Sequence, residues 1–243
     1  TIYSGNFSIL AGGEMAMDGG TIRITSANLR LYGNLTGTAN GGTVECSAAT
    51  IIGNGGTLTG NVASRIQFTR IADTNRFYPS GQGVVWSYFD LNNIPFLADA
   101  GVYTFVGALF HGGTDGLYVS NYVLYLVDCY IYGTSYGVRP SGALTVIGEN
   151  VTFGKDAGGS SSPNTGADLW FNSNNTPQTM RFRNCEFAST KEVNFVSAYL
   201  DVLSQAHDKD DDDWRHYQGL GHLAQPEFGA GAQGGSGTAV KCI

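Results

Sequence analysis

The sequence predicts an all-β protein: a right-handed, single-stranded parallel β-helix, or solenoid, of roughly nine rungs that ends in a C-terminal cap and linker. The main observation is one short pattern that occurs three times, around Asp128, Asn150 and Asn184. Each copy has two alternating apolar residues, then Asp or Asn, then two more alternating apolar residues and a small residue. These corner residues are about 22 and about 34 residues apart. Repeats of this length built from short strands are typical of solenoids.

Composition is the second observation. The chain has 243 residues, of which 42% are hydrophobic and 14% are charged, and it contains 35 glycines. This is enough for one large β domain, and low charge with many glycines is typical of a turn-rich fold. The net charge of -7 argues against nucleic acid as a partner. No apolar run reaches the roughly 18 to 20 residues that span a bilayer, so no membrane insertion is expected.

The register of the repeat predicts which side chains form the core. With the copies aligned on the corner residue, the residues between the inward positions should point outward, because alternate side chains of a strand lie on opposite faces. The second copy has extra residues at 147–149, so we expect a looser corner there. The predicted inward sets are Leu124/Leu144/Met180, Leu126/Val146/Phe182, Cys129/Val151/Cys185 and Ile131/Phe153/Phe187.

The four cysteines, at 46, 129, 185 and 242, have no metal-site spacing. In the register above, Cys129 and Cys185 occupy one inward site two rungs apart. That separation is about 9.6 Å, whereas a disulfide needs Cα atoms within about 7 Å. We therefore expect small buried apolar side chains.

From residue 1 to 69 the chain alternates short strands with glycine turns, and Asn28–Gly33 resembles the corner segment Asn150–Gly154. The middle third is rich in aromatic residues. We expect core packing for about half of them, and a subunit interface or a sugar-stacking surface for the others. Residues 155–168 read as a polar loop without packing of its own. The aromatic residues in question are Trp86, Tyr88, Tyr103, Phe105, Phe110, Tyr118, Tyr122 and Tyr125.

We divide the chain into a β-helix (1–190), a cap and hinge (191–221), and a linker with the first strand of a further domain (222–243). Residues 192–206 fit either a last rung or a short helix. The segment Thr238–Ile243 reads as a fresh strand that lacks a partner in this sequence.

The candidate binding residues lie on the predicted outer faces and in one loop. Tyr125, Tyr130 and Tyr132 point outward and suit carbohydrate stacking, and His111 and Asp115 share a glycine-rich loop. Asp128 near Glu149 resembles a catalytic carboxylate pair, but its corner position favours a turn role, so we assign no catalytic residue.

The acidic run after His207 is the one candidate metal site. Asp208, Asp210 and Asp212 offer oxygen ligands at alternating positions, which suits calcium. The run lacks the glycine and glutamate of an EF-hand loop, and a solvated charged hinge is the simpler interpretation. No other cofactor is expected.

The C-terminal segment carries a family resemblance. Its motifs are Ser204-Gln-Ala-His207-Asp208, Trp214-Arg-His-Tyr217-Gln-Gly-Leu-Gly221 and Gly234-Gly-Ser-Gly-Thr-Ala-Val-Lys241. They resemble the end of the solenoid in phage and virion-associated β-helix proteins, where a carbohydrate-binding-like β-sandwich follows. The resemblance covers about 40 residues closely, and the acidic run departs from it because the family's turn is short and glycine-rich.

The resemblance implies a non-enzymatic structural or adhesive component of a virion, such as a fibre, spike or capsid decoration. We expect self-association as a homotrimer, contacts with other virion proteins and with surface glycans, and a virion or extracellular location. Two alternatives stay open: a polysaccharide-degrading hydrolase or lyase of tailspike type, and a secreted bacterial surface adhesin.

Overall fold

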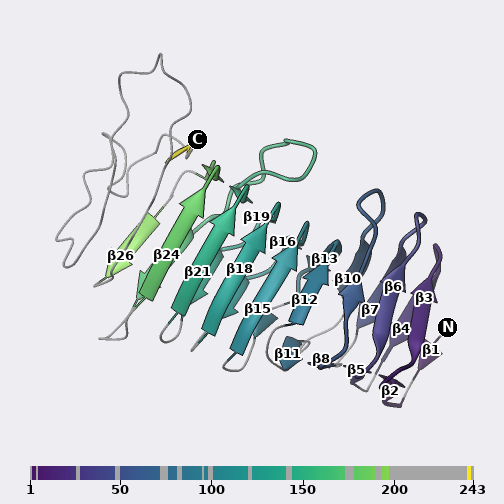
Figure 1. Ribbon diagram of the computed structural model, residues 1–243. Helices are drawn as coiled ribbons and strands as arrows, with labels where there is room; N and C mark the ends of the chain where they lie inside the picture. Colours follow the sequence, from purple (N-terminus) through teal and green to yellow (C-terminus); the bar gives the residue numbers. More distant parts are fainter. Residues whose placement is uncertain are drawn as a thin grey trace.

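The computed structural model describes residues 2–3, 5–25, 28–46, 50–71, 76–80, 84–94, 96–97, 101–119, 122–140, 144–172, 178–189, 193–196 and 240–241. Every element in these residues is a β-strand. Figure 1 shows the strands stacked side by side along one long axis, in chain order from β1 to β26. The predicted parallel β-helix is confirmed. Within these residues, no helix is long and apolar enough to cross a membrane.

Three parallel sheets form the sides of the solenoid, and each turn of the chain adds one strand to each sheet. Within the described residues, sheet A has ten strands, sheet B nine and sheet C eight. Sheet A contains β1 (Ile2–Tyr3), β4 (Thr21–Ile24), β7 (Gly42–Cys46), β10 (Ile66–Arg70), β13 (Phe89–Asn92), β16 (Leu109–His111), β19 (Tyr130–Tyr132), β22 (Thr152–Phe153), β25 (Glu186–Phe187) and β27 (Val240–Lys241). Sheet B contains β2 (Phe7–Ile9), β5 (Leu29–Leu31), β8 (Thr50–Asn54), β11 (Arg76–Ser80), β14 (Phe96–Leu97), β17 (Asp115–Val119), β20 (Tyr136–Pro140), β23 (Ala167–Asn172) and β26 (Val193–Val196). Sheet C contains β3 (Glu14–Met17), β6 (Asn34–Gly37), β9 (Leu58–Thr59), β12 (Val84–Ser87), β15 (Gly101–Val106), β18 (Tyr122–Val127), β21 (Leu144–Glu149) and β24 (Gln178–Arg183).

The inside of the solenoid is a continuous apolar core to which all three sheets contribute. Its middle is aromatic: Phe105 lies 5.4 Å from Phe89 and 5.2 Å from Phe96, both edge to face. The indole of Trp86 is also buried and donates a hydrogen bond to the Gly56 carbonyl at 3.0 Å. Of the seven predicted aromatic residues whose side chains the structure describes, four are in this core: Trp86, Tyr103, Phe105 and Phe110.

The predicted corner residues have the backbone conformation that a tight corner requires. Asp128, Asn150 and Asn184 follow strands of sheet C and precede strands of sheet A, with φ of 53°, 55° and 52°. Tyr88 and Gly107 occupy the same corner in earlier turns, with φ of 52° and 63°. Asn and Asp adopt this left-handed conformation at low cost because their short side chains bond locally.

The second copy of the repeat corrects two expectations. Residues 147–149 do not loosen a corner, because they continue β21 and pair with β18 and β24 along their whole length. The register therefore places Gly148, and not Val146, between Leu126 and Phe182. The Phe182 ring fills the space at Gly148, where an added Cβ would lie 2.5 Å from Cδ1 of that ring.

The same shift places Val146, and not Leu144, between Leu124 and Met180. The other two predicted inward sets hold. Ile131, Phe153 and Phe187 are adjacent across β19, β22 and β25, and the two phenylalanine rings stack at 4.8 Å. Cys129 and Cys185, together with Cys46, are buried thiols, while Cys242 lies outside the described residues.

Two segment interpretations were wrong. Asn28 precedes β5 of sheet B, whereas Asn150 precedes β22 of sheet A, so the two segments are not equivalent. The 155–168 segment is not a loop without packing of its own. Asn164 and Asp168 in this segment are fully buried, and Nδ2 of Asn164 donates a hydrogen bond of 2.7 Å to Oδ1 of Asp168.

Beyond residue 189 the structure describes two strands. Of the two alternatives for residues 192–206, β26 favours a last rung, since it pairs in parallel with β23. The terminal segment contains the expected strand, β27, but it does have a partner, because it pairs antiparallel with β25. The other predictions for the cap, hinge and linker concern residues outside the described part.

Candidate functional site

The five predicted binding residues are distributed over all three faces of the solenoid. Tyr125 lies on β18 in sheet C and is 37% exposed. Tyr130 and Tyr132 lie on β19 in sheet A, where His111 ends β16, and Asp115 begins β17 in sheet B. These residues therefore do not form a single stacking surface.

On sheet A, His111 and Tyr132 are brought together. They are register partners on β16 and β19, and their rings stack at 4.8 Å with an angle of 5°. His111 also contacts Asp90 on β13, whose Oδ1 lies 2.6 Å from Nε2. Burial raises the pKa of Tyr132 to about 12, with a further contribution from Asp90. His111 therefore directs its Nε2 to Asp90 and one face of its ring to Tyr132.

On sheet B, four other outward side chains gather around Asp115. Arg139 on β20 is the register partner of Tyr118 on β17. Val138 pairs with Leu169, so Trp170 on β23 lies next to Arg139 on the other side. We call Asp115, Tyr118, Tyr136, Arg139 and Trp170 the Arg139 cluster.

The centre of the cluster is the guanidinium group of Arg139. Its Cζ lies 4.9, 5.3 and 5.2 Å from the ring centroids of Tyr118, Tyr136 and Trp170. The rings of Tyr136 and Trp170 stack on each other at 4.6 Å. Such cation–π contacts fix the position of a guanidinium group while leaving its edge free to donate hydrogen bonds.

The carboxylate of the cluster is incompletely satisfied. Oδ1 of Asp115 lies 3.3 Å from Nε of Arg139, which is close enough for an ion pair. However, this oxygen is buried and receives no hydrogen bond, because the contact lacks hydrogen-bond geometry. Desolvation raises the pKa of Asp115, and the charge of Arg139 opposes that shift. A buried acceptor without a donor is uncommon in proteins.

The outer face of sheet C has a different character. Thr104, Tyr125 and Ile147 are adjacent across β15, β18 and β21, and aliphatic side chains flank them. Val85 is 53% exposed and Val102 37%. We call this surface the sheet C face; its apolar residues are Val85, Val102, Val106, Val123, Tyr125, Val127 and Ile147.

The most strongly perturbed carboxyl group is structural. Asp168 is fully buried, and its Oδ1 accepts hydrogen bonds from Ser189 Oγ at 2.6 Å and Asn164 Nδ2 at 2.7 Å. Burial raises its pKa to about 6, and the hydrogen bonds from Ser189 and Asn164 oppose that shift. Asn164 Oδ1 in turn accepts from Thr134 Oγ1 at 2.8 Å. This network holds the 155–166 loop against the solenoid and gives a substrate no access to the carboxyl group.

The remaining carboxylates support the turn interpretation of Asp128. Its Oδ1 accepts a hydrogen bond from Asn150 Nδ2 at 2.9 Å, one turn along the corner. Glu149 lies 3.9 Å from Arg183. The described residues contain no group of three or more metal-ligating side chains, and Asp208, Asp210 and Asp212 lie outside them.

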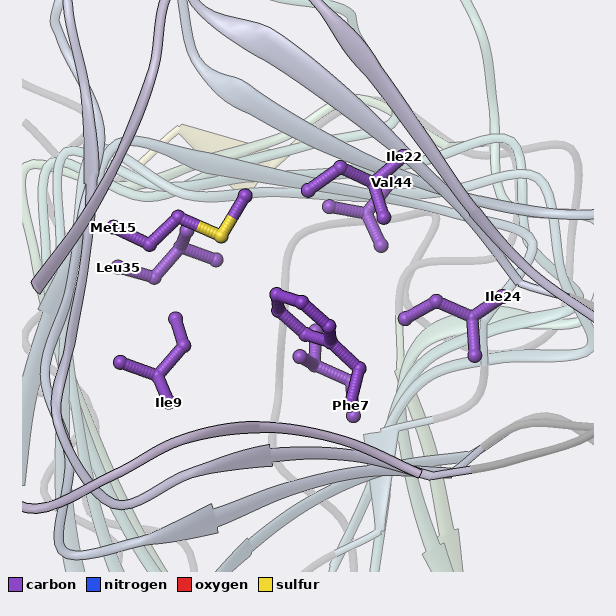
Figure 2. Close-up of a pocket in the computed structure, with 8 residues that line it drawn as sticks. Phe7, Ile9, Met15, Ile22, Ile24, Leu35 and Val44 are labelled. Carbon is purple, nitrogen blue, oxygen red and sulfur yellow. The ribbon is translucent and has the colours of Figure 1, made fainter. Parts of the chain in front are cut away.

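A pocket inside the first turns belongs to the core. Figure 2 shows apolar side chains from several strands around it, including Phe7, Met15 and Ile24. Its lining is entirely apolar, so it has nothing with which to orient a polar ligand.

The sequence interpretation named Asp115 and Tyr118 but did not connect them, and it missed Tyr136, Arg139 and Trp170. A signal was present: Tyr118, Arg139 and Trp170 each follow a buried aliphatic residue, namely Leu117, Val138 and Leu169. Alignment of these three strands on that residue would have placed them side by side. Searches of family models, curated proteins and solved structures gave no match to this chain.

Proposed function

We propose that this protein is a non-enzymatic structural and adhesive component of a virion or extracellular assembly, and that it self-associates as a homotrimer through the sheet C face. The solenoid supplies a rod, and its outer faces supply the contacts. The observation that carries the proposal is the apolar character of the sheet C face, which the packing of a single chain does not require.

The contrast with sheet A supports this assignment. Outward positions of sheet A are mostly polar, as shown by Thr43, Gln67 and Thr152, and ion pairs such as Arg23–Glu45 at 2.6 Å lie there. On sheet C the outward positions from β12 to β21 are different. Among those whose side chains the structure describes, one is charged, Glu149. Polar outward side chains, as on sheet A, suit a face in contact with solvent. Apolar outward side chains, as on sheet C, suit a face buried against another apolar surface.

The apolar part of the sheet C face has the size of a functional surface patch. Four strands about 4.8 Å apart and about 20 Å long give the apolar part an area of about 400 Å². Patches of about 300–600 Å² are the largest on a typical monomer and are often functional. The eight strands of the whole sheet cover about 600 Å², compared with roughly 800 Å² per partner in a standard interface.

A three-fold axis parallel to the solenoid fits the pattern of this face. It would place each strand at the same height as its copies, so the apolar strands β12–β21 of each chain would meet one another. The charged residues Arg181 and Arg183, at the C-terminal end of the sheet C face, would remain at the rim, where interfaces are polar.

Sedimentation velocity of the full chain tests the proposal. We expect a particle of three times the chain mass of 25.7 kDa. Val102→Asp and Tyr125→Asp should reduce it to a single chain, because each buries a charge in the interface. Thr43→Asp, on the outer face of sheet A, is the matched control and should leave the mass unchanged. A single-chain mass for the unmodified protein would overturn the proposal, and a stable two-chain mass would overturn the trimer.

A further inference from the structure

The Arg139 cluster has three properties that a binding site needs and that a purely structural ladder does not explain. It lies on the outer face of sheet B, and its residues are half-buried. The side chains of Arg139 and Asp115 are 27% and 13% exposed, so both reach the surface, although Oδ1 of Asp115 itself is buried. The aromatic rings hold the guanidinium group in place, which lowers the entropic cost of using it to bind a ligand.

The charges of the cluster select the class of ligand. Asp115 and Arg139 form a pair with no net charge. An anionic ligand that approached Arg139 would also meet the carboxylate, and a cationic ligand at Asp115 would meet the guanidinium group. Neutral ligands avoid both repulsions.

The hydrogen-bonding groups narrow the class further. The carboxylate of Asp115 offers acceptors but no donor, and a guanidinium group offers donors but no acceptor. A ligand that satisfies both must donate and accept hydrogen bonds from neighbouring atoms. Adjacent hydroxyl groups of a sugar do this, and the C–H face of the sugar ring packs on aromatic side chains such as Tyr118 and Trp170.

We propose that the Arg139 cluster is a binding site for a neutral saccharide, with Asp115 accepting from one sugar hydroxyl group, Arg139 donating to a neighbouring one, and the aromatic rings packing on the sugar. This inference rests on the adhesive part of the function proposed above. It uses a different face of the solenoid from the one that mediates self-association, so the site stays accessible in the assembly.

Titration with neutral hexasaccharides tests the site: those of α-1,4-glucose, β-1,4-glucose, β-1,4-mannose and N-acetylglucosamine. Isothermal titration calorimetry is the main readout, and intrinsic tryptophan fluorescence, to which Trp86 and Trp214 contribute as well as Trp170, is the second. We expect saturable binding of at least one neutral probe. Arg139→Met, which keeps the apolar stem, and Asp115→Asn should each weaken it by about tenfold or more.

Arg23→Ala is the matched control, because it removes an exposed arginine from an ion pair on sheet A; it should leave the affinity unchanged. A thermal melt of each variant verifies folding, and Tyr118→Leu provides a second route if Arg139→Met does not fold. Three results would overturn the site: no neutral probe binding below about 10 mM, binding unaffected by the cluster variants, or binding only of anionic polysialic acid and polygalacturonate. If no sugar binds but the protein is a trimer, the saccharide site is contradicted and the self-association proposal is not.

Discussion

One residue in a left-handed conformation allows the chain to turn from sheet C into sheet A. Asp128, Asn150 and Asn184 take this role in three later turns, and Gly19 and Gly41 take it in two early ones. For Asp128 the side chain adds a link along the rod, since its carboxylate accepts a hydrogen bond from Asn150. An apparent catalytic carboxylate is thereby explained by backbone geometry.

At the same scale, the buried carboxyl group of Asp168 makes stability depend on pH. Burial raises its pKa from an ordinary value of 3.8 to about 6. The folded state therefore binds the proton more tightly than the unfolded state, and the stability that this proton contributes is complete below about pH 4 and is lost as pH rises through about 6.

We expect the free energy of unfolding of the unmodified protein, relative to that of Asp168→Asn, to fall by about 2 kcal/mol between pH 4 and pH 7. Urea unfolding of both proteins at several pH values measures this difference. A difference that is independent of pH, or that grows as pH rises, would show that the carboxyl group is not held protonated by burial.

At the scale of the strand, register decides which residues share a layer of the core. Leu126, Gly148 and Phe182 are adjacent across sheet C, and the glycine leaves room for the phenylalanine ring. A Cβ at position 148 would lie 2.5 Å from Phe182 and 3.1 Å from Val151. A close-packed core tolerates such an addition poorly.

Gly148→Ala should therefore lower the free energy of unfolding by about 1–3 kcal/mol. Phe182→Leu in the same chain should recover part of this loss, with a coupling energy of about 1 kcal/mol in a double-mutant cycle. Gly20→Ala is the control, because a Cβ there meets nothing within 4 Å and the backbone is not left-handed. Additive effects of the Gly148 and Phe182 changes would contradict the assigned register.

The sequence allowed the fold to be predicted because the alternation of side chains and the corner residues are local properties. Phe153 and Phe187, for example, were aligned correctly from their distance to the corner. Gly148 was not aligned correctly, because the sequence alone does not tell whether extra residues lengthen a strand or the loop that follows it. The Arg139 cluster was missed for a related reason: its members come from three turns, and only the pairing of β17, β20 and β23 brings them together.

At the scale of the whole molecule, the three faces of the solenoid differ in chemistry. The outer face of sheet A is polar and has internal ion pairs, that of sheet B carries the Arg139 cluster, and that of sheet C is apolar from β12 to β21. A rod with this division can assemble through one face and bind a ligand through another. Self-association through the sheet C face is the central claim, because it determines which surfaces remain available.

Chemical cross-linking of single cysteines tests that claim most directly. Thr104→Cys places a thiol on the sheet C face, and Thr43→Cys places one on sheet A, in chains in which Cys242 is changed to Ser. The buried native thiols, Cys46, Cys129 and Cys185, should stay unreactive. Packed sheets lie about 10 Å apart, which a bismaleimide of similar reach can span. We predict cross-linked chains from Thr104→Cys and none from Thr43→Cys. Equal cross-linking of the two variants, or none from Thr104→Cys, would contradict the account.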